Sequence, residues 1–256
     1  MVAVMLGGSR ARGDHTAESD LDLGLYYDVP LNTTALGELA REVAGSEARV
    51  TEPGEWGHWV NGGAWLTVNG TQVDWLYRDV NRVHASWDAA KQGSYRFHAQ
   101  IGHPLGVPDF AYAGEVALGI ILADPTGHLS HLQRQITAYP PRLTEALVEG
   151  LWEASFLIDN ARKAVSRSDA TFVAGCLFRV VCLCAHALHG RSGRWLVNEK
   201  GAVASAARLG IAPDDFARRA HDVVAHLDAD PHELAVALDN ADDLVRDTAS
   251  ACQPSP

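Results

Sequence analysis

The spacing of apolar and polar positions changes near the middle of the chain. In the first half, short apolar runs alternate with helical segments, the pattern of a small α/β domain. Residues 102–108 are rich in glycine and proline, which interrupt helices and strands, so we predict a loop there. The expected strands are Val2–Leu6, Asp20–Tyr27, Ala64–Val68, Thr71–Tyr77 and Tyr95–Ile101, and the expected helices are Arg10–Thr16, Thr34–Ala44 and Asp79–Lys91.

Strand signals end near residue 125, after the breakers Asp124-Pro125-Thr126-Gly127. The remaining sequence has helical periodicity, with prolines at the first turns of the last two helices. We therefore predict a mixed-sheet α/β domain over residues 1–124 and an antiparallel helical bundle over 125–256, an α+β fold overall. The expected helices of the bundle are Leu143–Val165, Ala170–Leu188, Lys200–Leu209, Pro213–Leu227 and Pro231–Ala249.

A glycine pair follows the first predicted strand. Gly7 and Gly8 predict a sharp turn that places Ser9 at the start of a helix. Backbone N–H groups at a helix start have no partner inside the helix, so they bind phosphate oxygens well. Gly7-Gly8-Ser9 alone is a weak signal, because such triplets are common in loops.

Carboxylates occur at alternate positions in the second predicted strand. Asp20 and Asp22 point to the same face, because successive strand side chains alternate. A third carboxylate, Asp74, lies in an apolar strand after the tight turn Asn69-Gly70. Adjacent carboxylates repel each other, and a bare carboxylate in an apolar strand is costly unless it is paired or binds a metal ion. The set predicts a site for hard divalent cations and polyphosphate.

These motifs resemble the signature of the DNA polymerase β-type nucleotidyltransferase superfamily. Its pattern is Gly-Ser on a turn, Asp-x-Asp about ten residues later, and a third carboxylate on a neighbouring strand. The whole chain looks most similar to the bacterial antibiotic-modifying branch, which includes the kanamycin enzyme. The resemblance implies that Asp20, Asp22 and Asp74 bind two Mg²⁺ ions and that Gly8 and Ser9 bind the nucleotide.

The resemblance also implies a general base on the first long helix of the second domain. Glu145, Glu149 and Glu153 share one helix face, and we favour Glu153 because its apolar neighbours suggest that it lies deepest. Asp74 is the alternative base.

Cations must neutralise the triphosphate. Arg10 and Arg12 follow Ser9 and could flank the phosphates. Lys200 is the candidate from the second domain, and Lys163 is the second choice. For each of these four arginines and lysines, an ordinary surface position is about as well supported as a role in phosphate binding. Arg179, on an apolar helix, is expected to pair with an acid rather than to form an RNase motif with His186.

The net charge of −11 argues against a nucleic-acid partner. Residues 211–250 carry nine Asp and one Glu against three Arg, a balance of −7, which leaves −4 for the rest of the chain. No basic face is evident. An acidic protein attracts cationic small molecules, although the acidic surface could equally serve solubility.

No apolar run of about 18 residues and no basic leader are present, so we expect a cytoplasmic protein without a membrane span. Cys176, Cys182, Cys184 and Cys252 fit reduced thiols rather than disulfides or zinc ligands. The pairs His128/His131 and His186/His189 are expected on helix surfaces rather than at metal sites.

The predicted function is Mg²⁺-dependent transfer of NMP, with ATP as the expected donor, to the hydroxyl of a small molecule such as an aminoglycoside-like or lincosamide-like antibiotic. Two alternatives remain. One is a toxin or antitoxin that modifies tRNA or a protein, and the other is a non-catalytic nucleotide-binding protein. The resemblance alone suggests a homodimer.

Overall fold

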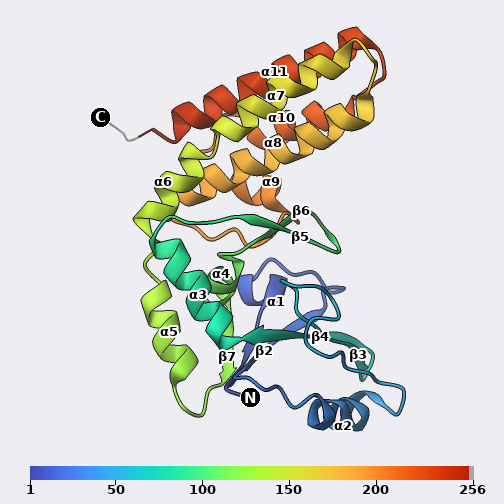
Figure 1. Cartoon of the computed structure of the whole chain (residues 1–256), viewed down its shortest axis with the longest axis vertical. Coiled ribbons are helices and arrows are strands. Elements are labelled where there is room, and N and C mark those ends of the chain that lie inside the picture. The colour runs from blue at the N-terminus through green and yellow to red at the C-terminus, as the bar shows by residue number, and fades with distance from the viewer. Residues whose placement is uncertain (254–256) are drawn as a thin grey trace. The chain divides into compact units, whose positions relative to one another are not determined.

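A mixed five-stranded sheet organises the first part of the chain in the computed structural model, which describes residues 1–253 (Figure 1). The strand order is β3-β4-β2-β1-β7; β2 and β4 are parallel, and the other neighbours are antiparallel. A separate two-stranded ribbon pairs β5 with β6. The strands are β1 (Ala3–Leu6), β2 (Leu21–Tyr27), β3 (Gly63–Val68), β4 (Thr71–Asp79), β5 (Phe97–Gln100), β6 (His103–Pro108) and β7 (Ile120–Ala123).

Helices lie on both faces of this sheet. The helix α2 packs on one face, where Ala40 joins a core of strand residues that includes Leu25 and Tyr77. The helices α1 and α4 lie on the opposite face (Figure 1). The helices of this part are α1 (Gly8–Arg12), α2 (Thr33–Ala44), α3 (Val80–Lys91), α4 (Ala111–Leu118) and α5 (His128–Ile136).

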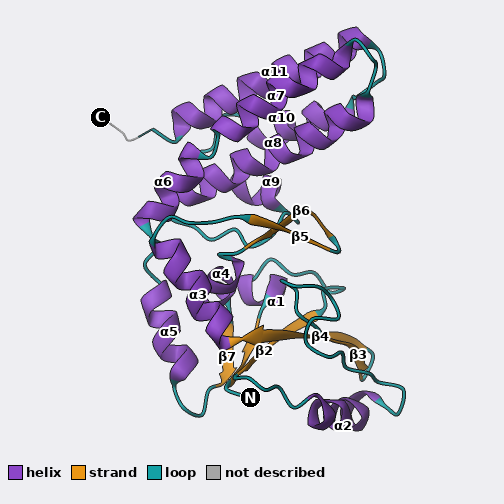
Figure 2. Ribbon diagram, in the orientation of Figure 1, coloured by secondary structure: helices purple, strands orange, loops and turns teal. Residues whose placement is uncertain are grey.

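The second part of the described chain is helical throughout (Figure 2). Its central element is α8, which packs against α6, α7, α9 and α11. The expected mixed α+β fold with a helical C-terminal region is thus confirmed. The helices are α6 (Pro141–Glu149), α7 (Trp152–Val165), α8 (Ala170–Arg191), α9 (Ala202–Ala206), α10 (Phe216–Ala225) and α11 (Pro231–Ala251).

The chain divides into two compact units. One comprises Met1–Ala90 with Tyr95–Ala138, and the other comprises Lys91–Ser94 and the chain from Tyr139 onward. The predicted boundary after residue 124 falls before α5, whereas the compact unit of the sheet includes α5.

The structure differs from the expected elements in several places, and the helix expected over Arg10–Thr16 is the shorter α1 (Gly8–Arg12). Residues 102–108 are not a loop, because Gly102, with φ +82°, makes the turn that lets β6 return along β5. Residues 120–123, to which no element was assigned, form the edge strand β7, which pairs with β1. The single helix expected over 143–165 is broken at Gly150, a poor helix former, where the Leu151 N–H donates to the Val148 carbonyl over only three residues.

The helix α8 meets the length and composition of a membrane span, with a mean hydropathy of 1.9 in its most apolar window. In this unit 67% of that window is buried, as in the core helix of a bundle. All four cysteines are buried and unbonded, as expected.

An ion pair between a buried arginine and a half-buried glutamate lies on the α4 side of the sheet. The Arg78 guanidinium, on β4, donates through Nη2 to Glu115 Oε1 at 2.7 Å and through Nε to the other oxygen. The Arg78 side chain is only 6% exposed. The carboxylate beside it and the carbonyl of Tyr77, which also accepts from Arg78, compensate the cost of burying this cation.

We predict that Glu115→Ala lowers the free energy of unfolding by about 3 kcal/mol, because it leaves the Arg78 charge buried without its partner. Urea denaturation followed by tryptophan fluorescence measures the loss. The control is Glu47→Ala, which removes an exposed partner of Arg49 and should cost under about 1 kcal/mol. Equal losses in the two variants would contradict the assignment.

Candidate active site

Three carboxylates meet on the face of the sheet opposite α2. The parallel pairing of β2 with β4 places Asp22 directly beside Asp74, and Asp20 immediately precedes β2. One oxygen of each carboxylate lies within 4.8 Å of the others. This is the only group of three such ligands among residues 1–253, so the structure brings together the set predicted from the motifs.

Strand alternation explains why these side chains share a face. Leu23 on β2 and Val73 and Trp75 on β4 point to the α2 side, where they are part of the core or pack against it. Their neighbours Asp22 and Asp74 consequently point to the other side. The apolar core of one face therefore fixes the direction of the acidic pair on the other.

The glycine turn sits directly against Asp22. The Gly7 N–H donates to the Asp22 carbonyl at 2.8 Å. Gly8 has φ +60°, and a Cβ at this position would overlap Asp22 Oδ2. Only glycine combines this backbone conformation with this close approach. Ser9 follows in α1, so the predicted phosphate-binding turn and the carboxylates form one continuous surface.

Arg10 has a structural role that the sequence did not reveal. Its guanidinium donates to the Ser19 carbonyl, at 2.6 Å from Nη2, and to the Asp20 carbonyl, at 3.0 Å from Nε. Arg10 thereby ties α1 to the residues that carry the first carboxylate. Arg12 forms an ion pair with Asp14 at 3.4 Å between Nε and Oδ2, and its side chain is 34% exposed.

Electrostatics at the site disfavour the charged form of Asp22. Burial raises the pKa of Asp22, and the negative charges of Asp20 and Glu115 raise it further, whereas Arg12 and Arg78 lower it. A divalent cation would relieve this repulsion, since carboxylate oxygens are the preferred ligands of hard cations. The donor set therefore fits a divalent metal ion.

The other predicted site residues lie in the helical unit. Glu153 is partly buried while Glu145 and Glu149 are exposed, so Glu153 is the deepest of the three, as expected. However, its neighbours Trp152 and Phe156 are 68% and 59% exposed, so the apolar surroundings expected from them are absent.

Glu153 has a specific partner. Its Oε1 accepts from Arg179 Nε at 2.5 Å, which confirms the expected pairing of Arg179 with an acid. Lys200 is exposed, and its backbone N–H donates to Asn198 Oδ1 at 2.9 Å. The catalytic role of Glu153 and the nucleotide-binding role of Lys200 stay predictions. Lys163, the second choice, lies in α7 and is also exposed.

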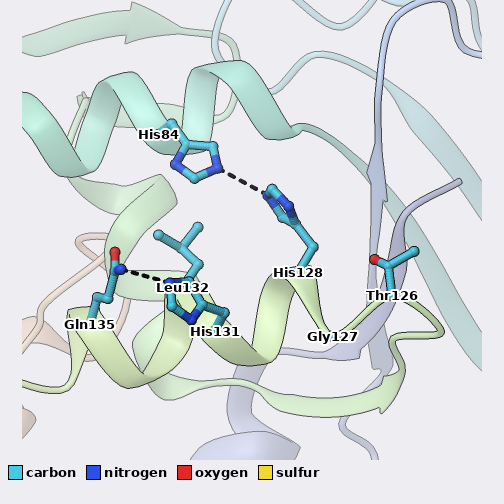
Figure 3. Close-up of a pocket in the computed structure, with 7 residues that line it drawn as sticks. All are labelled: His84, Thr126, Gly127, His128, His131, Leu132 and Gln135. Carbon is cyan, nitrogen blue, oxygen red and sulfur yellow. Dashed lines mark hydrogen bonds between the residues drawn. The ribbon is translucent and has the colours of Figure 1, made fainter.

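The histidine pairs occupy different environments. His186 and His189 are buried in α8 rather than on its surface, and burial lowers the pKa of His186 to about 3. His128 and His131 line a pocket of about 460 Å³ in the unit of the sheet (Figure 3). There His128 Nε2 lies 3.0 Å from His84 Nε2, and His131 Nε2 lies 2.9 Å from Gln135 Nε2. The two α5 histidines thus have separate partners.

Comparison with known families identifies the segment that builds the carboxylate cluster. Residues 2–74 match the family described as "Nucleotidyltransferase domain". The chain carries a nucleotidyltransferase domain. The matched segment of this nucleotidyltransferase contains the glycine turn and the Asp20/Asp22 pair, and it ends at Asp74, which supports NMP transfer as the general activity.

A solved structure that the chain resembles is a nucleotidyltransferase-like protein from Exiguobacterium sibiricum, with 12% identity and a TM-score of 0.44 over 95% of this chain and 68% of that one. No curated protein matches the chain.

We predict that Asp22→Asn raises the melting temperature of the metal-free nucleotidyltransferase by about 2 °C, because it removes one of three repelling charges. Mg²⁺ should raise the melting temperature of the wild type and leave that of the variant nearly unchanged. Differential scanning fluorimetry with and without MgCl₂ checks both effects. Glu38→Gln, which neutralises an exposed carboxylate on α2, should behave as the wild type; an unaltered Mg²⁺ response in Asp22→Asn would refute the site.

Proposed function

We propose that this enzyme transfers NMP from an NTP, with ATP as the preferred donor, to a hydroxyl of a small molecule in a Mg²⁺-dependent reaction. The observation that carries the proposal is the Asp20/Asp22/Asp74 cluster seated against the Gly7-Gly8-Ser9 turn. A polyphosphate needs both features, because its charge must be neutralised while its oxygens accept hydrogen bonds.

The three carboxylates would hold the metal ions, two in the proposed reaction. When bound, Mg²⁺ neutralises phosphate charge and activates the attacking oxygen. The chain itself supplies the positions of these ligands: Arg10 fixes the residues around Asp20, and the β2–β4 register fixes Asp22 beside Asp74.

Four residues are proposed to bind the nucleotide: Gly8, Ser9, Arg12 and Lys200. Gly8 permits close approach of backbone to the ligand, and Ser9 offers its N–H and hydroxyl at the start of α1. Arg12 is the cation of this set that lies near enough to Asp22 to affect its charge. Lys200 is the proposed contribution of the helical unit.

We propose Asp74 as the group that accepts the proton of the acceptor hydroxyl, with Glu153 as the alternative. Asp74 belongs to the cluster around which the transfer would occur. One oxygen of Glu153 is already occupied by Arg179, which supports an ion-pair role for this residue.

The acceptor is proposed to be a small molecule. The net charge of −11 disfavours nucleic acid, and an aminoglycoside-like or lincosamide-like antibiotic remains the proposed class. A toxin-like enzyme that modifies tRNA or a protein is the alternative. A non-catalytic role is disfavoured, because three repelling carboxylates have a cost that a binding module without metal has no reason to retain.

The test incubates the enzyme with Mg²⁺, each NTP labelled at the α-phosphate, and kanamycin A, lincomycin or bulk tRNA. Label should move to an antibiotic with release of pyrophosphate, and Asp22→Ala should abolish the transfer. Label on tRNA or on protein would favour the alternative. Absence of any transfer by the wild type would refute the proposed function.

Two variants separate the candidate bases. We expect Asp74→Asn to lower kcat by at least about 1000-fold, since both a metal ligand and the base are lost. Glu153→Gln should retain kcat within about tenfold and mainly lower stability through loss of the charged partner of Arg179. Steady-state kinetics and thermal melts measure these effects. If Glu153→Gln is the more damaging change to kcat, the base is Glu153.

A further inference from the structure

We propose that Trp65, stacked on Trp56, is the platform that binds the ring of the acceptor next to Asp74. This inference rests on the proposed function and deepens it, since it names the surface that the acceptor contacts. It comes from three observations: the register of β3 against β4, the exposure of one indole, and the order of groups across the sheet.

The register places Trp65 directly opposite Asp74. Asp74 pairs with Asp22 on one side and with Trp65 on the other, so the three residues form one row across β2, β4 and β3. Residues opposite each other in a sheet point to the same face, with Cβ atoms about 5 Å apart. Trp65 therefore stands on the active face, one strand away from the carboxylate cluster.

Trp65 is exposed although it is a large apolar side chain. Its exposed fraction is 70%, against 7% for Trp75, which points to the core on the other face. One face of the Trp65 indole stacks on Trp56, with ring centroids 4.3 Å apart and an interplanar angle of 17°. An exposed indole does not contribute the stabilisation that its burial would give, so the exposure of Trp65 favours a binding role.

The side chain of Gln100 holds the backbone of the supporting tryptophan, Trp56. The Trp56 carbonyl accepts from Gln100 Nε2 at 2.6 Å, and Gln100 Oε1 accepts from the backbone N–H groups of Trp59 and Val60. Gly63 also lies beside the ring: a Cβ there would overlap the Trp75 carbonyl and would come within 3.1 Å of the Trp56 ring. The stacked pair is thus held in place before any ligand binds, which reduces the entropic cost of binding.

The order across the active face indicates which substrate the platform serves. The glycine turn adjoins Asp22 at one end of the row, and Trp65 adjoins Asp74 at the other. In-line displacement places the attacking and leaving oxygens on opposite sides of the α-phosphorus. If pyrophosphate leaves towards Gly8 and Arg12, the attacking hydroxyl must come from the Trp65 end.

The distance between Trp65 and Asp74 limits which acceptors the site can bind. One strand spacing separates the indole from Asp74, so the reacting hydroxyl must be carried on the stacked ring itself or on an adjacent atom. A hydroxylated ring with an apolar face, as in a sugar, meets both conditions, because its C–H groups pack on the indole while a hydroxyl at its edge reaches Asp74. The hydroxyl proton passes to Asp74, the new O–P bond forms at the α-phosphorus, and the bond to pyrophosphate breaks.

The test compares Trp65→Ala and Trp65→Phe with the wild type in the transfer assay, using kanamycin A and lincomycin as acceptors. Ile101→Ala is the control, because it removes another exposed apolar side chain from the same unit. We expect Trp65→Ala to raise the KM for the acceptor about 10- to 50-fold and to leave the KM for ATP within about twofold. Trp65→Phe should recover most of the affinity.

The outcomes separate this inference from the proposed function. An equal or larger rise in the KM for ATP would mean that the indole holds the nucleobase, and unchanged constants would mean that it holds neither substrate; both overturn the inference. If the wild type transfers nothing, the proposed function fails. The role of Trp65 is then tested by measuring whether kanamycin A and lincomycin bind to the protein. Quenching of tryptophan fluorescence that Trp65→Ala abolishes supports it, and no Trp65-dependent binding overturns it.

Discussion

Mutual repulsion among Asp20, Asp22 and Asp74 is the constraint on which the first unit depends. The parallel pairing of β2 with β4 forces two of these carboxylates side by side, and the apolar face that packs on α2 maintains that pairing. Burial and negative neighbours raise the pKa of Asp22, so the charged form of this residue is held at a cost. The stabilisation from the apolar core on one face of the sheet offsets the repulsion among the carboxylates on the other face when no cation is bound.

Neighbouring cations stabilise the cluster without occupying it. Arg10 is committed to the Ser19 and Asp20 carbonyls, and Arg78 is committed to Glu115. These contacts of Arg10 and Arg78 are thus made to oxygens other than the three side-chain carboxylates of the cluster. Gly8 must lack a side chain for a steric reason, because a Cβ at this position would overlap Asp22 Oδ2.

The sequence predicted the acidic face because strand alternation and the tight turn Asn69-Gly70 are local signals. The same turn also fixes the pairing of Trp65 with Asp74, so this neighbour could have been found by counting residues outward from the turn. Other features depend on tertiary contacts. Glycine and proline suggested a loop where β6 pairs with β5, and the role of Arg10 requires the folded position of the loop before Asp20. Glu153 and Arg179 were each singled out from their helices, but their contact depends on how α7 packs on α8.

The row Gly8, Asp22, Asp74 and Trp65 gives the proposed reaction a direction. Chemistry at phosphorus requires a leaving group and a nucleophile on opposite sides, and the two ends of this row differ in kind. One end offers backbone N–H groups at a glycine turn beside Arg12, which suits an anion, and the other offers an exposed indole, which suits an uncharged or cationic ring. A reversed arrangement would place polyphosphate against an apolar surface, where its desolvation would have no compensating contact. The asymmetry of the row therefore favours a small ring-bearing acceptor over a second polyanion such as tRNA.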